Sequence, residues 1–93
     1  MEESKIEKRL KKEIELIGGK ALKFISPGMS GVPDRIVLFK GTAIFVELKA
    51  PGKKLRALQE HRAKELRNLG FEVRCIDSID KIKEFIGGLQ NEV

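Results

Sequence analysis

Two neighbouring β-type runs in this chain carry charged residues where buried strands would be apolar. The first run spans residues 31–39 and has Asp34 directly after a proline, and the second spans residues 44–50 and holds Glu47 and Lys49. Successive side chains of a strand point to opposite faces, so Glu47 and Lys49 share one face of their strand. Burying such charges without a partner is costly. The fold must therefore bring them to a place where something can bind them.

The short connection between the two runs brings the three charges together. Residues 40–42 read as a hairpin turn, so the two strands should be antiparallel neighbours, with the start of one opposite the end of the other. Two carboxylates favour a divalent cation, and a nearby lysine can stabilise charge at a phosphate. We therefore predict that Asp34, Glu47 and Lys49 form a Mg²⁺ or Mn²⁺ site that cleaves phosphodiester bonds. The alternative is an exposed Glu47–Lys49 ion pair on a solvated sheet face.

The composition fits one small globular domain, which we expect to span residues 1–93. No apolar run approaches the roughly 20 residues of a membrane-spanning helix. The single cysteine, Cys75, cannot form an internal disulfide, which favours a reducing cytoplasm. We therefore expect a cytoplasmic protein without a membrane role.

The charge balance favours an anionic partner. Nineteen Lys and Arg against 14 Asp and Glu give a net charge of +5, which attracts polyanions in general. Trp and Tyr are absent and only five Phe are present, so a base-stacking surface is poorly supplied. If nucleic acid is the partner, we expect contacts to its backbone from basic residues near the proposed site: Lys53, Lys54, Arg56, Arg62 and Arg35.

Apolar spacing and the positions of Gly and Pro predict the remaining elements. A first helix should begin at Ser4, with Ser4 and Glu7 at capping-box spacing, and should stop at the glycines 18–19. The other predicted elements are strands at 21–26, 35–39, 44–50 and 71–76, a helix over 55–68, and a last helix that Ser78 caps and Gly87-Gly88 end, with a frayed tail over 89–93. The order is helix, three strands, helix, strand, helix, which indicates an α/β fold.

Three polar positions on the predicted helices have two interpretations each. The helix over 55–68 would bury an apolar stripe, formed by Leu55, Leu58, Leu66 and Leu69. Gln59 and Arg62 project within the same arc, so either both reach an edge or a nearby carbonyl, or Gln59 points into the carboxylate patch. Glu7 either caps its helix or leans over the sheet as a further carboxylate, and spacing alone favours the cap.

These motifs together resemble the PD-(D/E)XK nuclease superfamily, through Pro33-Asp34 and the sequence Glu47-Leu48-Lys49 in this order of elements. More narrowly, residues 31–35 and 45–52 with Gln59 are similar to a stand-alone VRR-Nuc domain of the kind found in phages and bacteria. The resemblance runs from the helix at Ser4 to Ile76. It implies a restriction-endonuclease-like core, order α-β-β-β-α-β with a C-terminal helix, in which helices flank a central mixed sheet.

The resemblance also implies roles for single residues. Asp34 and Glu47 would be catalytic metal ligands, with the backbone carbonyl of Leu48 as a further ligand. Lys49 would be the catalytic lysine, and Gln59 matches the glutamine of the following helix. The remaining match is Glu7, which corresponds to a first-helix glutamate that joins the metal site, so the resemblance favours the ligand role over the cap.

The function that the resemblance implies is Mg²⁺- or Mn²⁺-dependent endonucleolytic cleavage of DNA, with branched structures such as Holliday junctions as substrates. It further implies a homodimer in a bacterial or phage-infected cell. The apolar side chains of the final helix would either make extra contacts between the two copies of the dimer or cover the sheet of their own chain. Two other readings stay open: a non-catalytic nucleic-acid-binding module of the same fold, and a nuclease that prefers linear DNA or RNA.

Overall fold

The sheet is organised around one hairpin, formed by β2 (Arg35–Phe39) and β3 (Thr42–Leu48). These strands are antiparallel, with Arg35 opposite Val46. In the turn between them Lys40 and Gly41 have φ of 46° and 78°, the two positive values that a type I′ turn requires. The predicted hairpin is confirmed.

The outer strands complete a mixed four-stranded sheet in the order β1-β2-β3-β4. In the computed structural model, which describes residues 2–91, β1 (Lys20–Lys23) pairs antiparallel with β2, and β4 (Glu72–Ile76) pairs parallel with β3. A parallel neighbour needs a crossover, and α2 (Ala57–Asn68) lies in that connection. The predicted α/β class and element order are confirmed.

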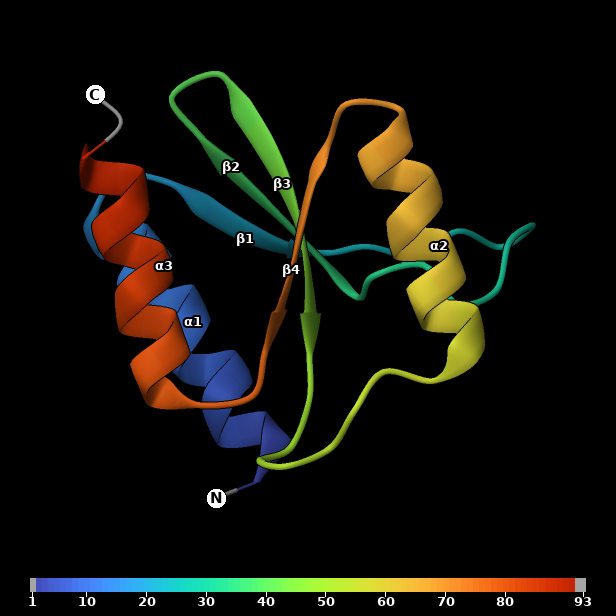
Figure 1. Cartoon of the computed structure of the whole chain (residues 1–93). Coiled ribbons are helices and arrows are strands. Elements are labelled where there is room, and N and C mark those ends of the chain that lie inside the picture. Colours follow the sequence, from blue (N-terminus) through green and yellow to red (C-terminus); the bar gives the residue numbers. More distant parts are fainter. Residues whose placement is uncertain (1, 92–93) are drawn as a thin grey trace.

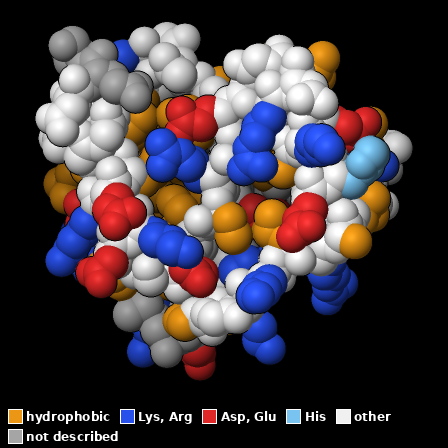
Figure 2. All heavy atoms as spheres, viewed as in Figure 1, with side chains coloured by type: hydrophobic (Ala, Val, Ile, Leu, Met, Phe, Trp, Pro, Cys, Tyr) orange, Lys and Arg blue, Asp and Glu red, His pale blue; other side chains and the backbone are white. Residues whose placement is uncertain are grey.

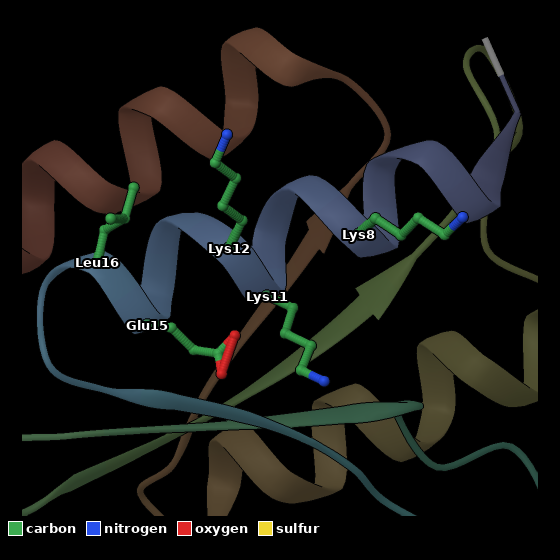
Figure 3. A pocket seen from close by; sticks show the side chains of 5 residues that line it. All are labelled: Lys8, Lys11, Lys12, Glu15 and Leu16. Atoms are coloured by element: carbon green, nitrogen blue, oxygen red, sulfur yellow. The ribbon is translucent and has the colours of Figure 1, made fainter.

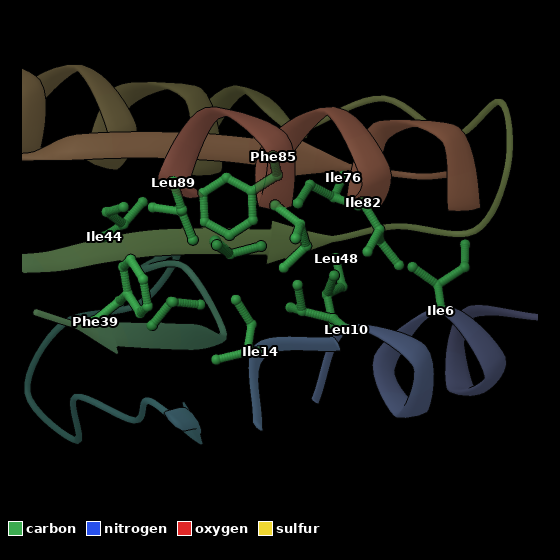
Figure 4. Close-up of a cluster of buried hydrophobic side chains, with 13 residues drawn as sticks. Ile6, Leu10, Ile14, Phe39, Ile44, Leu48, Ile76, Ile82, Phe85 and Leu89 are labelled. Carbon is green, nitrogen blue, oxygen red and sulfur yellow. The ribbon is translucent and has the colours of Figure 1, made fainter. Parts of the chain in front are cut away.

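Helices cover both faces of the sheet. Figure 1 shows α1 (Glu3–Leu16) and α3 (Ile79–Asn91) together on one face and α2 on the other. The larger core lies under α1 and α3, where Ile6, Leu10 and Ile14 meet the alternate residues Ile44, Val46 and Leu48 of β3 (Figure 4). A smaller core under α2 joins Phe45, Ala63 and Val73. Because β3 is covered on both faces, every residue of it from Ile44 to Leu48 is buried.

The start of α1 differs from the prediction. The helix begins at Glu3, its N-cap Glu2 makes no side-chain cap, and the expected capping box of Ser4 and Glu7 is absent. The Glu7 carboxylate instead forms an ion pair with Arg35 of β2. A charged partner inside the fold gives Glu7 a stronger interaction than a backbone N–H at an exposed helix end.

The prediction that four leucines form a buried stripe on α2 is wrong in part. Leu58 and Leu69 are 44% and 73% exposed, and Ala63 is the residue of this helix that is fully buried. The contacts of α2 with the sheet are made mainly to β4, so the helix covers only one side of that sheet face. Two of the four leucines therefore remain in water.

The end of α3 also differs from the prediction. The helix does not stop at Gly87-Gly88 but continues to Asn91, and Leu89, expected to be frayed, is 6% exposed in the larger core. Ser78 does cap the helix, because its Oγ accepts the N–H of Lys81 at 3.2 Å. Burial of Leu89 outweighs the helix-breaking tendency of the glycines, about 1 kcal/mol each. Residues 92–93 of the predicted tail lie outside the described residues.

Within residues 2–91, no helix has the length and apolar character needed to cross a membrane.

The continuation of α3 can be tested at Gly88. A Cβ added there meets nothing within 4 Å, and the backbone is not at positive φ, so we expect Gly88→Ala to raise the free energy of unfolding by about 0.5–1 kcal/mol. Urea unfolding measures the change. Gly70→Ala is the matched control, because Gly70 also has open space around it but has φ +98°, and there alanine should destabilise. A loss of stability in Gly88→Ala would contradict the continuous helix.

Candidate active site

The register of the hairpin places two carboxylates at the same end of the sheet. Since Arg35 lies opposite Val46, the next pair outward is Asp34 opposite Glu47. The backbone of Asp34 is fixed on its other side by the N–H of Phe24, which donates to its carbonyl at 2.9 Å. The side chain is fixed as well, because the N–H of Leu48 donates to Oδ1 of Asp34 at 3.2 Å. The hairpin therefore brings Asp34 and Glu47 together, as the sequence predicted.

Glu47 is buried, with 6% of its surface exposed, on the face of β3 that α2 covers. Two polar groups approach its Oε2 atom: Nε2 of Gln59 at 3.4 Å and Nζ of Lys49 at 3.9 Å. Both distances are long for a full hydrogen bond or a tight ion pair. The carboxylate is therefore only partly compensated by these neighbours.

Gln59 connects the site to the start of α2. Its Oε1 accepts the backbone N–H of Arg56 at 2.9 Å, while its Nε2 faces Glu47. The first contact satisfies a free N–H at the helix N-terminus, and it fixes the orientation of the amide. Of the two interpretations left open by the sequence, the one that points Gln59 into the carboxylate patch matches this geometry.

The electrostatics of the pair are those of two carboxylates with too little positive charge around them. The pKa of Glu47 is raised to about 7, mainly by burial and then by the charge of Asp34, while the charge of Lys49 lowers it. The pKa of Asp34 is also raised by burial, against the Leu48 N–H and the charge of Arg35, which lower it. Such a pair is stabilised by any cation that binds between its oxygens.

The loop before Asp34 is held against α2. Gly31 has φ +81°, and a Cβ there would lie 2.7 Å from Cγ of Leu58, so only glycine fits. Nε of Arg62 donates to the carbonyl of Ser30 at 2.8 Å, which is the carbonyl-bonding role that the sequence left open for it. Beneath this loop, a narrow cavity of about 10 Å³ reaches Glu47 and Gln59. It has room for about one water molecule.

The first-helix glutamate occupies a different place from the one expected. Glu7 is paired with Arg35, and no contact of Glu7 with Asp34 or Glu47 is found among the described residues. The acidic residue of α1 whose charge does raise the pKa of both Asp34 and Glu47 is Glu3. Sequence reasoning missed Glu3, although it lies one turn before Glu7 on the same side of the helix.

The basic residues expected to contact nucleic acid do not share one environment. Lys53, Lys54 and Arg56 are exposed in the segment between β3 and α2, and Figure 2 shows Lys and Arg side chains gathered along this lower edge of the molecule. Arg62 is half-buried and bonded to Ser30. Arg35, at 7% exposure, is buried beside Glu7, which corrects its assignment as a surface contact. Arg35 follows Asp34 directly in the chain, so its side chain points to the opposite face of the sheet, which α1 covers.

The donor set fits a hard divalent cation that keeps much of its water shell. Among the described residues, no group of three or more His, Cys, Asp or Glu side chains could hold a metal. The available ligands are instead two carboxylates, Asp34 and Glu47, which lie at the same end of the sheet. Their charges are only partly compensated by neighbouring groups. Mg²⁺ is commonly bound by one or two carboxylates, with waters completing its coordination. A softer metal would need thiolate or imidazole ligands that this edge does not have.

Two known proteins are similar to this chain over most of its length. A protein described as "Putative nuclease p44", from Acyrthosiphon pisum secondary endosymbiont phage 1, is 51% identical over 79 residues, which are 84% of this chain and 85% of that protein. A solved structure described as "VRR_NUC domain" superimposes with a TM-score of 0.84 at 30% identity, covering 91% of this chain and 94% of that one. No family model matches the sequence.

The raised pKa of Glu47 predicts how stability depends on pH without metal. The folded state binds a proton at Glu47 more tightly than the unfolded chain, so the free energy of unfolding should fall as pH rises from about 4.5 to about 7. The contribution is on the order of 3 kcal/mol. Urea unfolding in EDTA at several pH values measures it, with Glu47→Gln as the comparison. An identical pH dependence in both proteins would contradict the prediction.

Proposed function

Because this chain belongs to the VRR_NUC domain family, we propose that it is a nuclease that hydrolyses phosphodiester bonds. The observation that carries the proposal is the site itself: Asp34 and Glu47 meet at one sheet edge, with Lys49 on the same side as Glu47. Two carboxylates with raised pKa values beside a lysine, one of them buried and the other half-buried, are costly for a purely structural protein. The phage relative named as a nuclease supports the same activity.

We propose that Asp34 and Glu47 hold Mg²⁺ or Mn²⁺, with the carbonyl of Leu48 as a further ligand. When bound, the ion supplies positive charge at the scissile phosphate and lowers the pKa of water. The protein's own contribution is to position it. The Leu48 N–H fixes the Asp34 carboxylate, and Gln59 orients that of Glu47.

Lys49 carries the other positive charge of the site. Its Nζ lies 3.9 Å from Glu47 and its side chain is 16% exposed, so it is held close to the pair without being fully neutralised by it. In this position the ammonium can stabilise the charge that develops on a phosphate during hydrolysis. Glu7 has its carboxylate engaged with Arg35, which makes Glu3 the better candidate for a third acidic group.

The substrate that we propose is DNA, and branched DNA such as a Holliday junction in particular. The resemblance to stand-alone VRR-Nuc domains supports this choice. The exposed Lys53, Lys54 and Arg56 beside the site supply contacts to phosphates without reading bases. The scarcity of aromatic residues argues against single strands held by stacking.

We also propose that the chain acts as a homodimer, in the cytoplasm of a bacterial or phage-infected cell. Two copies supply two sites for the two strands that junction cleavage requires. The apolar face of α3 is used inside the protomer, since Ile82, Phe85 and Ile86 are buried in the larger core. Exposed apolar side chains lie instead on the sheet face that α2 leaves open, at Leu22 and Leu38.

Divalent metal should stabilise the fold through the carboxylate pair. Two carboxylates about 4 Å apart repel by on the order of 4 kcal/mol at an effective dielectric near 20, and a cation removes this repulsion. We expect Mg²⁺ or Mn²⁺ to raise the melting temperature by several degrees over KCl of equal ionic strength. Asp34→Ala should abolish the rise, and Asp80→Ala, on the exposed start of α3, should keep it. A metal-independent melt of the intact protein would contradict the site.

Cleavage should depend on Lys49. A panel of labelled four-way junction, flap, linear duplex and RNA, incubated with Mg²⁺, measures both activity and preference. We expect the intact protein to cut the junction fastest, and Lys49→Ala to be slower by about 100-fold or more. Lys64→Ala, which removes an exposed lysine of α2, should cut normally.

The same panel separates the alternatives. Binding without metal-dependent cleavage would favour a non-catalytic binding module, and faster cleavage of linear DNA or RNA would replace the junction as substrate. Light scattering on the same samples should give twice the 10.5 kDa mass of one chain.

A further inference from the structure

The outward face of α1 carries a row of lysines that the proposed active site does not use. Lys5, Lys8 and Lys12 follow one another at helical spacing and are exposed, on the side opposite the buried Ile6 and Leu10. Lys11 lies to one side of these three lysines and is also exposed. We refer to Lys5, Lys8, Lys11 and Lys12 together as the α1 lysine row.

The α1 lysine row lines two shallow surface depressions. One is formed by Lys8, Lys11 and Lys12 with Glu15, and the other by Lys5, Lys8, Arg9 and Lys12 with Ile79 of α3. Figure 3 shows the lysines of the first depression extending from α1 in different directions rather than converging on one point. This arrangement does not suit a single small anion. An extended polyanion that passes over the helix can meet several of them.

Charge on α1 is distributed unevenly around the helix. Arg9 is paired with Glu13 at 2.9 Å, and Glu7 is paired with Arg35, whereas no ion pair is found for the lysine row within residues 2–91. The α1 lysine row is therefore a strip of positive charge that no ion pair among the described residues neutralises.

The α1 lysine row begins beside the active site. Glu3, two residues before Lys5 on the same helix, is close enough to the site for its charge to act on both Asp34 and Glu47. From Lys5 to Lys12 the helix rises about 10 Å. Duplex DNA has one phosphate per strand for about each 3.4 Å of its axis, so this length matches about three phosphates.

We propose that the α1 lysine row binds the phosphate backbone of a duplex DNA arm that extends from the active site along α1. The inference rests on the proposed function, because the DNA at the active site sets the direction of the arm. It adds a second contact surface, separate from Lys53, Lys54 and Arg56 on the segment between β3 and α2. A branched substrate can place one arm on each surface.

The test compares two triple variants of equal net charge. One replaces Lys5, Lys8 and Lys12 by alanine, and the control replaces Lys20, Lys23 and Lys64, which are exposed on β1 and α2. Fluorescence anisotropy with a labelled four-way junction in EDTA gives the dissociation constant between 50 and 200 mM salt. We expect the α1 variant to bind about 10- to 100-fold more weakly at 100 mM salt, with the salt slope reduced by about 2–3. The control should change much less.

Three outcomes would overturn the inference. Unchanged affinity in the α1 variant, with DNA binding by the intact protein, overturns it and leaves the proposed function intact. An equal loss in the control shows that net charge alone sets the affinity. If the intact protein neither binds nor cleaves the nucleic acids of the panel, the proposed function and the inference fall together. Melting temperatures of the variants check that a loss of binding is not a loss of fold.

Discussion

The repulsion between the buried carboxylate of Glu47 and the half-buried carboxylate of Asp34 is the constraint that the rest of the structure depends on. Asp34 and Glu47 come from adjacent strands, and the register that apposes them is the same register that buries the core residues of β2 and β3. A slip of one residue would separate the carboxylates, but it would also turn the apolar side chains of β3 to the wrong faces. The stability of the larger core therefore holds the two charges together.

The surrounding elements reduce that repulsion without removing it. The Leu48 N–H stabilises the charge of Asp34, and the Arg35 charge lowers its pKa, while Lys49 and Gln59 approach Glu47 only at long distances. A fully neutralised pair would have little affinity for a cation, whereas a pair without any compensation would repel more strongly. The partial compensation leaves a remaining repulsion between the two carboxylates that a bound cation would relieve.

How far the sequence predicted this arrangement depends on the range of the interactions. The β2–β3 hairpin and the meeting of Asp34 with Glu47 followed from a short turn and strand alternation, which are local. The end of α3 was mispredicted because the burial of Leu89 against distant strands overrides the local preference of Gly87 and Gly88. The pairing of Glu7 with Arg35 depends on where α1 crosses the sheet, which no local spacing encodes.

Arg35 illustrates why the same residue can be misassigned and still matter to the site. It follows Asp34 in β2, so alternation sends its side chain to the α1 face while Asp34 remains with Glu47 on the other. On that face a buried guanidinium requires a carboxylate, which Glu7 supplies. Together with the packing of Ile6, Leu10 and Ile14, the ion pair holds α1 across the sheet, and this crossing places Glu3 near the carboxylates and the lysines on the outer face. The Glu7–Arg35 pair, buried at Arg35 but 43% exposed at Glu7, thereby links the geometry of the active site to that of the surface beyond it.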